Sequence, residues 1–311
     1  MRFKKNKALF PLSVELKSIV NYLHSILQID NFTLFGGAAL DLLVDPGTKI
    51  NDLDIGITYN IDTIQKVKSN LLSSGYKLVG DDRPYFINMI TPVTMVFAQN
   101  DKYILDISFL ENLSDVGQFD IESLFCRYPE MDYVDTHSAI QAYEHKTINP
   151  INGLNIENPF LLINRFISLC TKYNLSINDN NYHKKIVECL KKRLSSWSND
   201  DYLHGKMARV AHISHILKAI VRVKNKKSFI NELTESGILS VTFPELQETL
   251  LSIDLSKLEQ SNNLNQKEDV AKFIVENASS VNRNIILSKF LSLNLRGWDS
   301  VDKKINLLTQ H

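Results

Sequence analysis

Residues 35–43 and 51–55 restrict this chain more than any other part of its sequence. The first segment reads Phe-Gly-Gly-Ala-Ala-Leu-Asp-Leu-Leu, and the second reads Asn-Asp-Leu-Asp-Ile. An apolar run, two glycines and a run of helix formers predict a strand, a tight turn and a helix. The second segment predicts another strand, in which Asp52 and Asp54 point to the same face because side chains alternate along a strand.

Two carboxylates this close repel each other, and a divalent cation that supplies the opposing charge stabilises them. Oxygen ligands of this kind suit Mg²⁺, which shares its remaining coordination positions with water and phosphates. Gly36 and Gly37 allow a phosphate to approach backbone N–H groups at the positive end of the following helix. The combination predicts metal-assisted phosphoryl or nucleotidyl transfer. Each feature alone has an ordinary explanation, because Gly-Gly pairs are common in turns and Asp-x-Asp pairs are common on solvated strands.

A third carboxylate, Asp106, lies at the centre of the apolar segment 102–109. An Asp in such a strand is costly unless it faces water, a partner or a metal. Together, Asp52, Asp54 and Asp106 could hold two Mg²⁺ ions about 3.5–4 Å apart, one at the attacking oxygen and one at the leaving group. These three residues are the predicted catalytic and metal-binding set.

The pattern resembles the catalytic head of the nucleotidyltransferase superfamily that includes DNA polymerase β. It is most similar to the bacterial CCA-adding enzymes and poly(A) polymerases. The family motif of Gly-Gly, two residues, Arg-Asp, a small apolar run and Asp-x-Asp matches Gly36, Gly37, Asp41, Asp52 and Asp54. Leu40 replaces the Arg of the motif, and Asp106 lies at the strand position of the family's third carboxylate. The resemblance implies an enzyme that uses two Mg²⁺ ions and a nucleoside triphosphate (NTP), and it extends to about residue 177.

The family element that reads the incoming base is altered in this chain. In the family, an Asp and an Arg read the base edge, whereas this chain has Asn158 for the Asp and Leu161 or Leu162 for the Arg. Asn and Leu cannot reproduce recognition by a carboxylate–guanidinium pair, so ordered addition of C, C and A by the family's mechanism is not expected. Arg165 and Lys172 either contact the triphosphate or form a solvated stripe. The predicted nucleotide-binding set is Gly36, Gly37, Asp41, Asn158, Arg165 and Lys172.

Strand and helix patterns predict an α+β fold with two domains. Residues 1–115 are expected to form the nucleotidyltransferase head, a small mixed sheet with helices on one side. Its elements are predicted at 12–28, 31–35, 38–43, 52–59, 61–73 and within 85–110, with a hairpin turn at Asn100-Asp101. Residues 116–311 are expected to form an all-helical neck and body that binds the acceptor. Its helices are predicted at 118–127, 158–174, 182–196, 204–225, 228–236, 244–253, 266–277 and 282–293.

A basic region in the second domain is a candidate for RNA binding through phosphate contacts. Its members include Lys191, Lys192, Arg193, Arg209, Arg222 and Lys224. A purely solubilising surface is the alternative, because charge runs are usually solvated. His212 and His215 share a helix face, but no carboxylate at ligand spacing accompanies them, so a zinc site is not expected.

Composition adds few further constraints. The chain has 35 Lys and Arg against 35 Asp and Glu, so no global basic field indicates nucleic acid. Its three cysteines lack metal-ligand spacing and predict free thiols in a reducing compartment. No segment approaches the roughly 20 apolar residues of a membrane span. We therefore expect a cytoplasmic protein without a membrane partner.

Three functional hypotheses follow, in decreasing order of support. The first is transfer of a nucleoside monophosphate to an RNA 3′ hydroxyl with a tRNA-like acceptor, in a specialised modifier or toxin rather than a housekeeping CCA-adding enzyme. The second keeps the chemistry but uses a protein or small-molecule hydroxyl as acceptor. The third is a non-catalytic relative that binds nucleotide, RNA or protein. The sequence names neither the nucleotide nor a regulatory protein partner, and it leaves both open.

Overall fold

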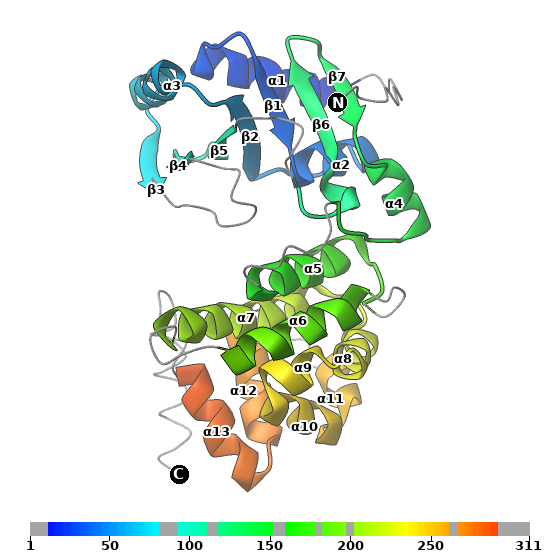
Figure 1. The fold of residues 1–311 in the computed structure, drawn as a ribbon. Coiled ribbons are helices and arrows are strands. Elements are labelled where there is room, and N and C mark those ends of the chain that lie inside the picture. Colours follow the sequence, from blue (N-terminus) through cyan, green and yellow to red (C-terminus); the bar gives the residue numbers. More distant parts are fainter. Residues whose placement is uncertain are drawn as a thin grey trace. The chain divides into compact units, whose positions relative to one another are not determined.

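The structure is a computed structural model that describes residues 12–80, 93–110, 117–151, 159–177, 182–196, 202–260 and 266–291. The chain forms two compact units, Met1–Asn155 and Ile156–His311. The first unit combines a seven-stranded sheet with helices and the second is helical, which confirms the predicted α+β class (Figure 1). The division lies after Asn155 rather than near residue 115, because β6, which was predicted as helix, and β7, which was not predicted, belong to the sheet of the first unit.

The sheet has the strand order β3-β4-β5-β2-β1-β6-β7. Its strands are β1 (Phe32–Phe35), β2 (Asp52–Thr58), β3 (Lys77–Gly80), β4 (Val93–Ala98), β5 (Ile104–Leu110), β6 (Leu124–Tyr128) and β7 (Asp132–Asp135). Neighbouring strands are antiparallel except β2 and β5, which run parallel. The hairpin turn predicted at Asn100-Asp101 is confirmed, because Asp101 adopts a left-handed φ of 59° between β4 and β5.

Side-chain alternation gives the sheet two chemically different faces. One face is apolar and fully buried, and it includes Leu34, Leu53, Ile55, Phe97 and Ile107. Helix α1 (Val14–Leu27) covers this face, since His24 stacks on Tyr128 of β6 with ring centroids 4.4 Å apart, and Tyr128 stacks on Phe32 at 5.1 Å. Helices α2 (Gly37–Val44) and α3 (Ile61–Ser73) pack beside α1 (Figure 1). The opposite face carries the predicted carboxylates Asp52, Asp54 and Asp106, and we call it the acidic face.

The helices of the first unit differ in how they begin. The side chain of Ser13 accepts the Leu16 N–H at the start of α1 (3.1 Å), and the side chain of Asn60 caps α3. Helix α2 has Gly36 as its N-cap, and this residue makes no side-chain capping bond. No N-cap side chain therefore bonds the first N–H groups of α2, which have no acceptor within the helix itself.

The prediction of a helix over residues 118–127 is wrong. Residues 120–122 form one turn of 3₁₀ helix, η1 (Asp120–Glu122), and β6 follows it, paired with both β1 and β7. Asp120 Oδ1 accepts the N–H groups of Ile121 (2.8 Å) and Asn149 (2.9 Å), which ties the turn to a distant segment. A short apolar run such as that of β6 fits a helix or a strand equally well, and only its pairing partners decide.

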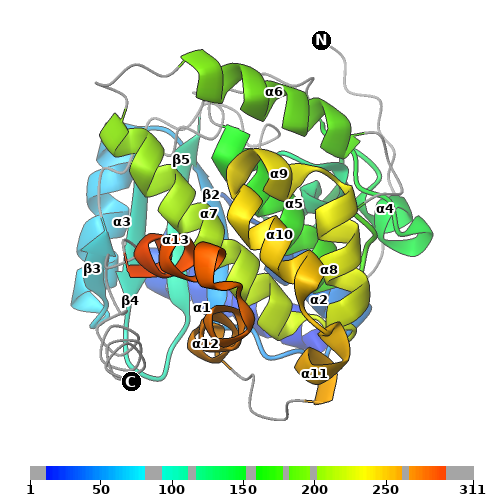
Figure 2. The same cartoon turned by 90° about the horizontal axis from the view of Figure 1, so that it is seen from below.

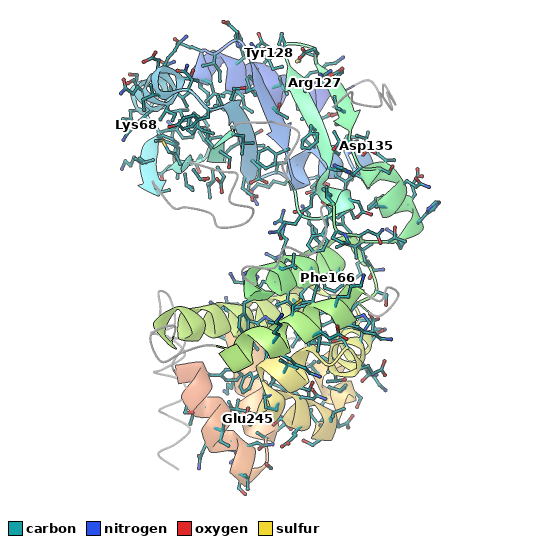
Figure 3. All side chains as sticks on the ribbon, in the orientation of Figure 1. Lys68, Arg127, Tyr128, Asp135, Phe166 and Glu245 are labelled. Atoms are coloured by element: carbon teal, nitrogen blue, oxygen red, sulfur yellow. The ribbon has the colours of Figure 1, made fainter. Side chains whose placement is uncertain are left out.

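Charged side chains close the hairpin of β6 and β7. Arg127 of β6, labelled in Figure 3, donates from Nε to Asp132 Oδ1 (3.1 Å) and from Nη2 to Oδ2 (2.8 Å), a two-point ion pair between register partners of the hairpin. The carboxylate of Asp135 accepts the N–H groups of Ala139 (2.7 Å) and Ile140 (3.2 Å). Asp135 thereby initiates α4 (Ala139–His145), a helix that the sequence analysis did not predict.

The second unit consists of packed helices. They are α5 (Pro159–Tyr173), α6 (Tyr182–Ser196), α7 (Tyr202–Arg222), α8 (Lys226–Glu235), α9 (Ile238–Thr242), α10 (Pro244–Ser252), α11 (Leu255–Gln260), α12 (Lys267–Asn277) and α13 (Ser280–Leu291). The long helices lie within a few residues of their predicted positions, whereas the short α9 and α11 were not predicted. Helix α7 packs against α5 and α12 (Figure 2), and Phe166 of α5 is fully buried (Figure 3). Among the described helices, none is long and apolar enough to cross a membrane.

His212 of α7 links three helices of this unit. Its Nδ1 lies 2.6 Å from Asn164 Oδ1 on α5, and its Nε2 lies 3.1 Å from Thr242 Oγ1 on α9. Burial lowers the pKa of His212 to about 3, with a smaller contribution from His215. The imidazole is therefore neutral, and Nδ1 donates to Asn164 Oδ1, which can only accept. The unprotonated Nε2 shares the hydroxyl proton of Thr242 with Ile238 O, which lies 2.9 Å from Thr242 Oγ1.

Acid is expected to destabilise the second unit through His212. The unfolded chain has an ordinary imidazole pKa near 6.5, so falling pH protonates the unfolded state before the folded state. The contribution to stability is complete above about pH 6.5, and it falls by up to about 1.4 kcal/mol per pH unit toward the folded pKa. A His212→Gln variant should be less stable at pH 7.5 but lose less on acidification to pH 5, as measured by urea unfolding. An acid-induced loss equal to that of the unmodified chain would contradict this assignment.

Candidate active site

Asp54 and Asp106 lie side by side on the acidic face. They are register partners in the parallel pair of β2 and β5, so their Cα atoms are about 4.8 Å apart and their side chains share one face. Both residues are partly buried. Asp52 is exposed two residues earlier in β2, opposite Ile104. The structure thus brings two of the three predicted carboxylates together and places Asp52 at the edge of the same face.

Gly36 brings the start of α2 against Asp54. Its backbone angles, φ 70° and ψ −149°, belong to a region that is almost restricted to glycine. A Cβ atom at this position would overlap Oδ2 of Asp54 and lie 3.2 Å from its Cγ. The turn therefore requires glycine twice, for its backbone conformation and for the space beside the carboxylate.

The start of α2 combines a positive helix end with neighbouring negative charge. Gly37 opens the helix, no acidic residue lies in its first turn, and Asp41 follows one turn later as a partly buried residue. The helix dipole and the first N–H groups favour an anion at this end. Asp54 lies against the same turn and would repel a bare anion, so an anion is favoured there only together with a cation.

The carboxylates of Asp54 and Asp106 are the kind of oxygen ligand that Mg²⁺ prefers. Over the ranges that the structure describes, no group of three or more Asp, Glu, His and Cys side chains converges closely enough to hold a metal ion. Mg²⁺ commonly uses only one or two protein carboxylates, because it keeps water and substrate phosphates as its other ligands. Asp54 and Asp106 supply two such oxygen donors beside a helix end that favours an anion. The arrangement suits a metal ion that arrives together with a phosphate ligand.

A hydrophobic cluster lies on the acidic face, and one of its members is next to the carboxylates. Leu110 and Phe125 are each 3% exposed, and the partly buried Phe35 packs against them. Phe35 is also the register partner of Asp54 across β1 and β2. The sequence analysis did not single out Phe35 as a site residue, because its position beside the carboxylates depends on strand order, which local patterns do not give.

Several predicted nucleotide-binding and RNA-binding residues are exposed on the second unit. The described ones are Arg165 and Lys172 on α5, Lys191 and Lys192 on α6, Arg222 at the end of α7, and Lys224 after it. Asn158 lies outside the described residues, as do the side chains of Arg193 and Arg209. The structure describes each unit by itself, so these positions are assigned within the second unit alone.

Arg165 belongs to a group of cations that the sequence did not reveal. This group, which we call the basic cluster, comprises Arg165 of α5, Lys218 and Arg222 of α7, and Lys267 of α12. Burial lowers the pKa of His215, and three members of the cluster lower it further. Burial also lowers the pKa of Lys218. Lys267 and Arg222 lower this pKa further, whereas Glu268 raises it. Three helices therefore bring these cations together, with Glu268 ion-paired to Lys267 beside them (Oε1 to Nζ, 4.0 Å).

Comparison of sequences assigns no family to the chain. No protein-family model matches it. A chitinase-like protein, Idgf5, from Glossina morsitans morsitans is 27% identical over 182 residues, which is 53% of this chain. The match covers 38% of that protein, so the chain spans less than half the length of this relative. Identity at this level over half of a chain does not establish common membership of a family.

Solved structures share the fold over nearly the whole chain. A CCA-adding enzyme in complex with CTP matches with a TM-score of 0.62 at 16% identity, covering 93% of this chain and 72% of that one. The Thermotoga maritima CCA-adding enzyme complexed with tRNA gives 0.62 at 15% identity, covering 98% and 74%. A CCA-adding enzyme with ATP gives 0.63 at 14%, covering 98% and 73%. The predicted resemblance is confirmed at the level of the fold, and identities this low show the fold alone.

Proposed function

We propose that this chain transfers a nucleoside monophosphate from an NTP to the 3′ hydroxyl of an RNA, with Mg²⁺ as cofactor. The juxtaposition of Asp54, Asp106 and Gly36 at the start of α2 carries the proposal. The fold supports it, because the matching structures are CCA-adding enzymes in complex with CTP, ATP or tRNA.

Each part of the site has a role in this reaction. The N–H groups at the start of α2, opened by Gly36 and Gly37, bind the triphosphate. Asp54 and Asp106 would hold Mg²⁺, which offsets phosphate charge and activates a coordinated hydroxyl when bound. The 3′ oxygen of the acceptor forms a bond to the α-phosphorus, and the bond from that phosphorus to the bridging oxygen breaks. Pyrophosphate leaves, and the hydroxyl proton passes to a carboxylate of the site.

The basic cluster supports an RNA acceptor. Like charges gathered from three helices repel one another, and Glu268 offsets part of this repulsion through its contact with Lys267 (Oε1 to Nζ, 4.0 Å). A polyanion would offset more of it. An RNA backbone supplies phosphates at regular spacing, and binding it releases condensed counterions. The cluster is therefore a better candidate for RNA contacts than isolated exposed lysines.

Replacing Arg165 and Arg222 together with Ala is expected to weaken RNA binding about tenfold or more at low salt, because two phosphate contacts are lost. The slope of log Kd against log salt concentration should also decrease by about 1 for each lost contact. Filter binding of a labelled single-stranded RNA across a salt series measures both quantities.

A double substitution of Lys191 and Lys192 with Ala is the matched comparison, because it removes the same charge from exposed positions of α6. We expect a smaller loss of affinity and a nearly unchanged slope. A larger effect at α6 than at the basic cluster would move the RNA surface to α6.

A transfer assay with blocked ends tests the acceptor. The protein is incubated with Mg²⁺, one α-labelled NTP at a time, and RNA whose 3′ ends are intact or oxidised by periodate. Label in intact RNA but not in oxidised RNA is the expected result. Label in oxidised RNA, or on protein in place of RNA, would overturn the 3′ hydroxyl as acceptor and favour another hydroxyl.

A further inference from the structure

The ring of Phe35 adjoins the carboxylate pair on the acidic face. Phe35 and Asp54 are register partners in the antiparallel pair of β1 and β2, where opposed Cβ atoms are about 5 Å apart. Asp54 is in turn the register partner of Asp106. An aromatic ring, a carboxylate and a second carboxylate therefore stand in one row across three neighbouring strands.

The packing of Phe35 holds its ring in place while leaving part of it exposed. Leu110 and Phe125 support the ring from a buried cluster, and Phe35 itself is only partly buried. Gly36 follows immediately, with a backbone conformation fixed by the approach of α2 to Asp54. A ring that is already ordered loses little conformational entropy when a ligand packs on it, so it contributes more to affinity.

We infer that Phe35 is the platform on which the base of the bound nucleotide stacks. The inference rests on the proposed function, which places the triphosphate at the start of α2 beside Asp54. From that position, the base of the same nucleotide lies within one nucleoside length of Phe35, which precedes the turn and flanks the carboxylate.

Stacking also suits the altered base-reading element of this chain. Every base has a π-face, so an aromatic platform binds all four without distinguishing their edges. Asn158 replaces the carboxylate that reads the base edge in the family that the sequence resembles. We therefore expect nucleotide binding that depends on Phe35 and discriminates weakly among bases.

Equilibrium dialysis of the full chain with Mg²⁺ and α,β-methylene analogues of ATP, GTP, CTP and UTP tests the platform without requiring transfer. Phe35→Leu retains an apolar side chain against Leu110 and Phe125 but removes the π-face. We expect it to weaken binding of all four analogues about tenfold, whereas Phe35→Tyr should bind like the unmodified chain. Val134→Ala is the matched control, because Val134 packs against the same cluster as a partly buried residue, and its binding should not change.

The outcomes separate this inference from the function it rests on. An equal loss for all four analogues, with the unfolding temperature of Phe35→Leu close to that of the unmodified chain, supports the platform. Unchanged binding in Phe35→Leu, or a loss confined to one base, overturns the platform while the proposed function stands. Failure of the unmodified chain to bind any analogue overturns both. If Phe35→Leu does not fold, Phe35→Met replaces it with the same expected loss, because Met fills irregular gaps in a core.

Discussion

Replacing Asp54 with Asn is expected to lower the rate of nucleotidyl transfer by at least about 10³-fold, equivalent to about 4 kcal/mol. Asn keeps the size of the side chain but lacks the negative charge that a metal ligand needs. Asp106→Asn should have an effect of the same order, because Asp106 is the register partner of Asp54. The double variant should lose little more than either single variant, since both residues serve one site. Single-turnover transfer of an α-labelled NTP measures these rates.

The matched control for Asp54→Asn is Asp101→Asn. Asp101 is exposed in the turn between β4 and β5, with a left-handed backbone that Asn also adopts readily. This variant makes the same change in charge outside the site, so its transfer rate should stay within about twofold of the unmodified chain. An Asp54→Asn variant that folds and transfers at the rate of Asp101→Asn would remove Asp54 from the site.

Replacing Gly36 with Ala is expected to damage both stability and activity. The backbone conformation of Gly36 costs a residue with a side chain about 1–3 kcal/mol, and the added methyl group also overlaps the Asp54 carboxylate. The turn or the carboxylate must shift, and a displacement of about 1 Å at a catalytic group costs on the order of 100-fold in rate. Thermal unfolding and the transfer assay measure the two effects on the same preparation.

Gly47→Ala is the control for a general cost of losing glycine. Gly47 is exposed, its φ lies outside the left-handed region, and an added Cβ would lie 3.4 Å from Asp45 Oδ1, an ordinary contact. Its stability should change by less than about 1 kcal/mol and its activity should not change. Equal losses in Gly36→Ala and Gly47→Ala would show that the approach of α2 to Asp54 has no special role.

The sequence predicted those parts of the fold whose capping residues or apolar patterns lie within the element itself. Helices α1 and α3 begin after Ser13 and Asn60, whose side chains cap them. In the strands before and after Gly36, apolar residues are consecutive or alternate with polar ones, and this pattern matches the burial of their side chains. The sequence analysis missed strands β6 and β7 because the spacing of their apolar residues fits the period of a helix as well as that of a strand. Their strand character comes from pairing partners, since β6 pairs with β1, more than 90 residues earlier in the chain, and β7 pairs with β6.

The site was predictable in its residue types but not in its arrangement. The Asp-x-Asp spacing predicts a shared face for Asp52 and Asp54, whereas the pairing of Asp54 with Asp106 depends on the parallel register of β2 and β5. Phe35 is placed by the same strand order. Local sequence patterns carry no such information, because register is set by contacts between distant segments.

In the second unit, the sequence indicated basic residues but not which of them meet. Arg165 was considered as a triphosphate contact or as part of a solvated stripe, and the packing of α5 on α7 places it with Lys218 and Arg222. His212, considered with His215 for a metal site, bonds instead to Asn164 and Thr242 inside the helix packing. In both cases the decisive neighbours come from other helices.

The most direct test of nucleotidyl transfer is to follow the two ends of one NTP. The protein is incubated with Mg²⁺, RNA and either α-labelled or γ-labelled NTP, beside the Asp54→Asn variant. The account predicts that α-label enters RNA, that γ-label leaves as pyrophosphate in equal amount, and that both signals disappear in the variant. Transfer of the γ-label to RNA, or label transfer that persists in Asp54→Asn, would contradict it.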